Sequence, residues 1–306
     1  MQVRHKQALN AAILVAGLAF CVAALMRLQW QYPLHVSLTA GGVLVVVACA
    51  LLALSATTFA WQCYMKAFLN VRLPLRDALY QICVMQIGKY VPVMIGGFVA
   101  RVSANVGNLS TERIVVATTV EQIGAMGVAL LVGICCYVLA LIPAAAALGL
   151  ACTILVAWFA PAVLAVALRI FARLRGGMGS AVWAVDRPSP RLLREALGLQ
   201  VLQMIAMVGF IGGIVSMIAP HLGVSSVAIV TGAYLISVVI GIAIFFLPGG
   251  IGAREAVLIW LTAGQIDSRE ALQLALALRI GMSALDLLAG ATCLVLRLPL
   301  HGGRRH

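Results

Sequence analysis

Four ionisable side chains lie within stretches of the sequence that are otherwise apolar. They are Arg101, Glu121, Arg279 and Asp286. Arg279, Ser283 and Asp286 are spaced four and three residues apart, so a helix would carry them on one face. Charges within membrane-spanning segments face one another or a water-filled cavity, because exposure to lipid is costly. We therefore predict an intramembrane charge network.

Two kinds of chemistry are open to this network. In the first, Glu121 and Arg279 form a buried ion pair that locks two parts of the protein together. In the second, Glu121 or Asp286 carries a proton, as intramembrane carboxylates do in pumps and transporters.

A second constellation is the segment "LPGGIGARE", Leu247–Glu255. Its glycines allow a ligand to approach the main chain closely, and the free N–H groups of a following helix favour an anion. Arg254 would add a guanidinium that matches a phosphate. We predict a substrate-binding site made by Gly249, Gly250, Gly252, Arg254 and Glu255. The alternative is a tight turn whose arginine extends to the membrane surface.

An earlier segment has the same pattern. Each segment contains a proline, a glycine pair and an arginine: Pro92, Gly96, Gly97 and Arg101 in the first, and Pro248, Gly249, Gly250 and Arg254 in the second. Gly96, Gly97 and Arg101 are therefore predicted to join the substrate-binding site.

Each segment is also followed by a signal for the start of a helix. The signals are "STE" at Ser110–Glu112 and "SRE" at Ser268–Glu270, where a hydroxyl can cap the helix. Glu121 and Arg279 lie equally far beyond the two serines. This match predicts an internal repeat, with cores at residues 77–142 and 225–297.

The composition places these residues in a membrane protein. Of 306 residues, 63% are hydrophobic and 10% are charged, and the mean hydropathy is +1.09, whereas soluble domains are about one quarter charged. We predict an all-α, polytopic membrane protein that forms a single membrane domain over residues 1–306. Six full spans are expected, at about 8–26, 38–62, 114–141, 144–170, 195–219 and 271–296.

Two further apolar regions, 77–107 and 225–264, are interrupted at their centres. The first is too short to cross the membrane twice, which favours a re-entrant hairpin. The second is long enough either to dip or to cross twice. Three full spans separate the two hairpins, so they enter from opposite sides and form an inverted repeat, as in many secondary transporters.

The net charge of +12 does not indicate a nucleic-acid-binding protein, because the basic residues cluster in alternate loops. Six arginines lie between residues 169 and 194 alone. This distribution follows the positive-inside rule and places both termini in the cytoplasm. No P-loop, dinucleotide-binding, metalloprotease or serine-hydrolase motif is present, and the cysteines and histidines lack metal-ligand spacing. We expect neither enzymatic activity nor a cofactor or metal.

The chain resembles the flippase-like family related to the transmembrane region of lysylphosphatidylglycerol synthases. The resemblance rests on "GKYVPVMIGGFVAR" (Gly88–Arg101), on Glu121–Gln122 and above all on "LPGGIGARE", and it covers about residues 10–297. It implies a bacterial inner-membrane protein that moves or handles lipids. It does not include the soluble domain of the synthases, so their aminoacyl transfer is not expected here.

The resulting prediction is a lipid transporter, or flippase, whose substrate has an anionic or phosphate-bearing head group. Its partners would be membrane lipids, and phospholipids and polyprenyl-phosphate-linked lipids are both open. The alternative is a non-transporting membrane partner of a lipid-modifying enzyme or glycosyltransferase, or a hopanoid-associated membrane protein. Transport by the pure protein separates the two classes.

Overall fold

The computed structural model describes residues 37–88, 96–104, 110–142, 189–244 and 252–297, and these residues form only helices and their connections. Five helices are long and apolar enough to cross a membrane: α2 (Ala40–Leu69), α5 (Thr111–Leu141), α8 (Pro190–Ile218), α9 (Val224–Ala243) and α11 (Ser268–Arg297). The protein is therefore an all-α, multi-pass membrane protein, as predicted.

Four of the six predicted spans correspond to α2, α5, α8 and α11. The predicted spans at 8–26 and 144–170 lie outside the described residues. So does most of the arginine-rich loop.

The two interrupted regions contain the shorter helices. In the first, α3 (Leu75–Gly88) has 14 residues and α4 (Gly96–Ser103) has 8. At 1.5 Å per residue, neither approaches the roughly 30 Å thickness of the hydrocarbon core. In the second, α9 has 20 residues but α10 (Ala253–Thr262) has only 10. Each region thus ends in a helix too short to span the membrane.

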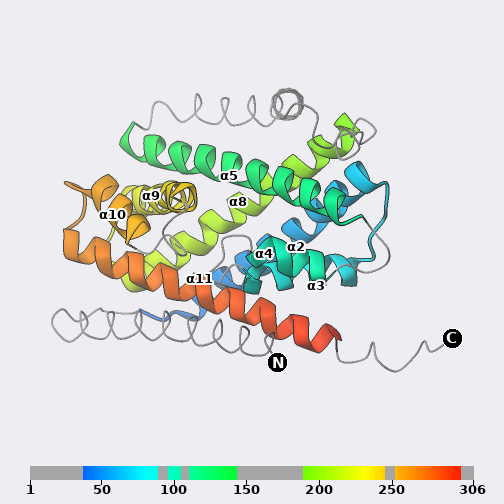
Figure 1. Cartoon of the computed structure of the whole chain (residues 1–306). Coiled ribbons are helices and arrows are strands. Elements are labelled where there is room, and N and C mark those ends of the chain that lie inside the picture. The colour runs from blue at the N-terminus through cyan, green and yellow to red at the C-terminus, as the bar shows by residue number, and fades with distance from the viewer. Residues whose placement is uncertain (1–36, 89–95, 105–109, 143–188, 245–251, 298–306) are drawn as a thin grey trace.

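Helices that are distant in the sequence pack together in a regular way. The long helices α2 and α8 pack against each other, α5 packs against α9, and α11 packs against α3. Figure 1 shows α2 and α8 crossing the centre, α5 and α11 on opposite sides, α9 and α10 at one end, and α3 and α4 towards the other. Because α5 leads away from α4 and α11 leads away from α10, the two outer helices run in opposite directions.

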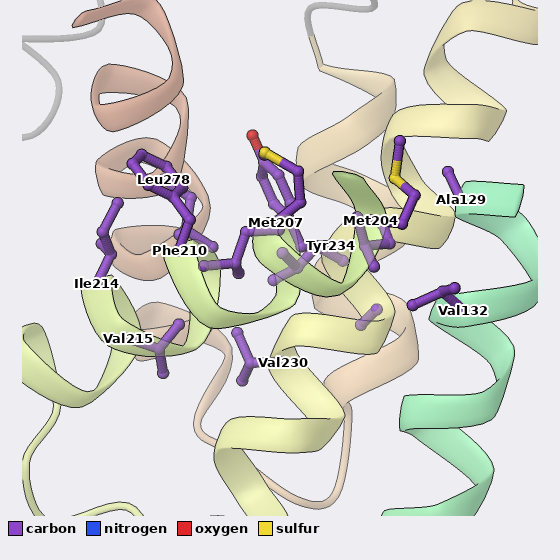
Figure 2. Packing of buried hydrophobic residues seen from close by; sticks show 14 of the residues in the cluster. Ala129, Val132, Met204, Met207, Phe210, Ile214, Val215, Val230, Tyr234 and Leu278 are labelled. Atoms are coloured by element: carbon purple, nitrogen blue, oxygen red, sulfur yellow. The ribbon is translucent and has the colours of Figure 1, made fainter. Parts of the chain in front are cut away.

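Apolar side chains of α8 hold the centre of the largest core cluster. Phe210, Ile214 and Val215 of α8 are buried with Val230 of α9 and Leu278 of α11 (Figure 2). A second buried cluster surrounds Trp61 and joins α2, α3, α5 and the start of α8. Each of these apolar clusters lies next to one set of buried charged side chains.

Gly209 and Gly213 allow α8 to pack closely against α2. A Cβ atom on Gly209 would lie 2.6 Å from Cys49 Sγ, and one on Gly213 would lie 2.8 Å from Val46 Cγ2. Both residues face α2 across the α2–α8 contact.

The predicted helix caps are confirmed in the first case and wrong in the second. Ser110 is the N-cap of α5, and its hydroxyl accepts a hydrogen bond from the Arg113 amide. In α11 the cap is Asp267, whose Oδ1 accepts from the Arg269 amide at 2.8 Å. A carboxylate just before Ser268 takes the capping position, since Asp caps as well as Ser. Arg279 is therefore one residue deeper in its helix than Glu121 is in α5.

Gly232→Ala is expected to destabilise the protein by about 1–3 kcal/mol, the usual cost of overpacking. A Cβ atom there would lie 2.6 Å from the Gly133 carbonyl oxygen and 2.8 Å from the Tyr137 amide nitrogen, and neither backbone atom can move without shifting α5. Thermal or denaturant unfolding in detergent measures the change. Gly127→Ala is the matched control, because no atom lies within 4 Å of the added Cβ. Equal stability of the two variants would contradict the α5–α9 contact.

Candidate functional site

The buried charges form two separate ion pairs. Arg101 of α4 pairs with Glu121 of α5 through Nη1 and Oε2. Arg279 of α11 pairs with Glu255 of α10 through Nη1 and Oε1. The predicted Glu121–Arg279 pair is therefore wrong: each helix after an interrupted region pairs with the short helix just before it. The polarity is reversed, since the short helix carries the cation in the first pair and the anion in the second.

The Arg101–Glu121 pair is buried completely. The side chains are 1% and 4% exposed. Arg101 Cζ lies 3.9 Å from the ring centroid of Trp61, well within the range of a cation–π contact. Its Nη1 also lies 3.5 Å from Thr118 Oγ1. The guanidinium is thus held by a carboxylate, a hydroxyl and an aromatic face.

Neighbouring amides extend this cluster. Trp61 Nε1 donates to Gln81 Oε1 at 2.7 Å, while Gln200 Nε2 donates to the Glu121 carbonyl oxygen at 2.9 Å. Tyr64 donates from its hydroxyl to Gln200 Oε1 at 3.2 Å. Two buried donors of the cluster, Gln81 Nε2 and Arg101 Nε, have no acceptor among the described residues. We call these side chains the first polar cluster.

Gly96 and Gly97 serve the packing of the first interrupted region. Both are buried in the first turn of α4. A Cβ atom on Gly88 would lie 2.8 Å from the Gly96 carbonyl oxygen and 2.9 Å from Gly97 Cα. The three glycines therefore bring α3 and α4 into backbone contact. The sequence predicts that Gly96 and Gly97 bind substrate. The close packing of α3 against α4 is sufficient to explain why glycine stands at these positions.

A cavity lies beside the second ion pair. Its lining residues come from α9, α10 and α11: Tyr234, Ser237, Arg254, Glu255, Leu258, Ala275 and Arg279. Its volume is about 10 Å³, which is about the space that one water molecule needs. Of the residues predicted to bind substrate, Arg254 and Glu255 line this cavity. The structure does not bring Arg101 to it, because that side chain belongs to the first polar cluster.

Glu255 connects two elements of the cavity wall, α10 and α11. Its Oε2 accepts a hydrogen bond from the Gly252 amide at 2.8 Å, and its Oε1 binds Arg279. Gly252 has a φ of +84° and precedes the first turn of α10, a conformation that glycine adopts without strain. Gly249 and Gly250, the other predicted glycines, lie outside the described residues. The carboxylate therefore joins the start of α10 to α11.

Gly241 makes room for Arg254. A Cβ atom at Gly241 would lie 2.4 Å from Arg254 Cγ and 2.8 Å from Arg254 Nε. The arginine side chain thus lies directly on the backbone of α9. The sequence alone does not distinguish Gly241 from other glycines, because only the fold brings it to α10.

Asp286 belongs to the same region. Ser283 and Asp286 are 7% and 5% exposed, so the predicted polar face of α11 is buried. Asp286 follows Arg279 by two turns on the same face of α11, while Arg254, Glu255 and Arg279 line the cavity. We call these four charged side chains the second charged cluster.

Comparison with known proteins adds no relatives: no family model, no curated protein and no solved structure matches this chain. Within the part of the chain that the structure describes, no group of three or more His, Cys, Asp or Glu side chains could hold a metal ion. The site must therefore be interpreted from its own chemistry.

The residues of the cavity and of the first polar cluster that the sequence did not predict are uncharged. Tyr234 and Ser237 line the cavity, and Trp61, Gln81 and Gln200 complete the first polar cluster. Tryptophan, tyrosine and serine are common in membrane helices, so their type alone gives no signal. The signal for the two glutamines is stronger, since each stands within an apolar stretch of the sequence.

Proposed function

We propose that this protein is a lipid transporter of the bacterial inner membrane, which moves a lipid with a phosphate-bearing head group between leaflets. The observation that carries the proposal is the cavity lined by Arg254, Arg279 and Glu255 among helices that are long and apolar enough to span a membrane. Two guanidinium groups suit a phosphate, because each presents several N–H donors in a plane. Lipid tails would remain among the apolar helix surfaces.

We further propose that the chain is an inverted repeat. A long helix, the two helices of an interrupted region and a second long helix follow one another twice, in α2–α5 and in α8–α11, although α9 has 20 residues and α3 has 14. The opposite directions of α5 and α11 and the reciprocal contacts of α5 with α9 and α11 with α3 support it. Each repeat then begins with a long helix, α2 or α8, that lies before the repeat cores predicted from the sequence. The positive-inside rule then places both termini in the cytoplasm.

The test is transport by the purified protein alone. Liposomes containing the protein and a phospholipid with a fluorescent acyl chain are treated with a membrane-impermeant quencher. We expect the fluorescence of the inner leaflet to be lost faster than in protein-free liposomes, because the protein carries labelled lipid outwards. Equal rates would contradict transport and would favour the non-transporting partner of a lipid-modifying enzyme or glycosyltransferase.

A further inference from the structure

The second charged cluster is electrically balanced. Arg254 and Arg279 carry positive charges, and Glu255 and Asp286 carry negative charges, so the formal charges cancel. The cluster is largely removed from solvent: the side chains of Arg279 and Glu255 are 21% and 14% exposed, and Asp286 is 5% exposed. A ligand that enters must therefore preserve this balance or leave a poorly solvated charge without compensation.

A head group that carries only a phosphate upsets the balance. Since the cavity has the volume of about one water molecule, the phosphate must displace the Glu255–Arg279 pair to reach the guanidinium. Among the described residues, Glu255 would then keep only the Gly252 amide as a hydrogen-bond donor. A head group that also carries a cation replaces both members of the Glu255–Arg279 pair, because its phosphate binds Arg279 while its cation binds Glu255.

From this balance we infer that the site at this cavity, once the Glu255–Arg279 pair has opened, binds a zwitterionic head group, with its phosphate at Arg254 and Arg279 and a primary ammonium at Glu255. The inference rests on the proposed function and narrows its substrate class. An ammonium with N–H donors suits a carboxylate, since such hydrogen bonds are charge-assisted. A quaternary ammonium has no such donors and prefers a cage of aromatic rings, whereas Tyr234 is the only aromatic residue among the described residues that line the cavity.

The inference is tested by lipid preference. The purified full-length protein in detergent is titrated with short-chain phosphatidylethanolamine, phosphatidylglycerol and phosphatidylcholine, and dissociation constants are measured by calorimetry. We expect phosphatidylethanolamine to bind about tenfold or more tightly than phosphatidylglycerol, the effect of one charge-assisted contact. Phosphatidylcholine should bind less tightly than phosphatidylethanolamine.

Charge variants sharpen the test. Asp286→Asn gives the cluster a net positive charge, so the preference should move towards phosphatidylglycerol by about tenfold. Glu255→Gln makes the same charge change and serves if Asp286→Asn does not fold, as judged by thermal unfolding. Glu112→Gln, on the exposed first turn of α5, should leave the preference unchanged.

The possible failures are distinct. Equal affinity of the wild type for phosphatidylethanolamine and phosphatidylglycerol, or an unchanged preference in the folded charge variants, would overturn the zwitterion inference while lipid binding stands. Absence of binding to all three lipids, together with absence of transport in liposomes, would overturn the proposed function itself.

Discussion

Glu121→Gln is expected to destabilise the protein by about 3–5 kcal/mol, the cost of leaving one partner of a buried ion pair uncompensated. Arg101 is 1% exposed, so water cannot replace the lost carboxylate. Unfolding in detergent, followed by loss of helical circular dichroism, measures the effect. The double variant Arg101→Gln with Glu121→Gln should be more stable than the sum of the single changes predicts, because it removes both charges.

Two comparisons make this prediction specific. Glu195→Gln breaks the Arg191–Glu195 pair, whose side chains are 84% and 45% exposed, and should cost no more than about 1 kcal/mol. Glu121→Gln combined with Arg279→Gln should be additive, since these residues belong to different pairs. Strong coupling between Glu121 and Arg279, with none between Glu121 and Arg101, would show that the pairing described here is wrong.

Arg254→Gln is expected to weaken lipid binding about ten- to hundredfold, the equivalent of about 1.5–3 kcal/mol for a lost charge-assisted contact. Glutamine keeps much of the side chain's length and polarity but removes the charge and the planar fork of donors. Calorimetric titration with phospholipid measures the affinity, and transport in liposomes should fall in parallel. Arg72→Gln is the matched control, because Arg72 is exposed in the connection between α2 and α3.

A second variant tests the position of Arg254 without changing its charge. Gly241→Ala places a methyl group where Arg254 Cγ now lies, so the arginine must leave its conformation over α9. We expect reduced lipid affinity in a folded protein, while Gly198→Ala, whose added Cβ has no atom within 4 Å, should have little effect. Full affinity in both Arg254→Gln and Gly241→Ala would remove Arg254 from the site.

The sequence predicts the class of fold well because membrane helices are recognised by length and apolar composition. α2, α5, α8 and α11 each lie near a predicted span. The interruptions were also recognisable, since proline and glycine break an apolar helix. Their paths were less so: the length of the second region left open whether it dips or crosses twice, and it contains a helix of 20 residues, α9, and one of 10, α10.

Sequence predicts which charges are buried but not how they pair. Arg101, Glu121, Arg279 and Asp286 were all identified as membrane charges and Glu255 as a substrate-binding residue, yet the predicted partner of Glu121 was wrong. Equal depth in two helices says nothing about which faces meet in three dimensions. Trp61 illustrates the same limit: it lies on α2, and only the fold brings its ring against Arg101.

The local pairing of charges has a consequence for how the chain enters the membrane. Glu121 follows Arg101 by 20 residues, and Arg279 follows Glu255 by 24 residues. In each pair the second residue is therefore synthesised only seconds after the first, at ribosomal rates of about 5–20 residues per second. Arg101 and Glu121 therefore do not have to wait, unpaired in lipid, for the C-terminal helices to be translated. The N-terminal helices can pack together in the bilayer first.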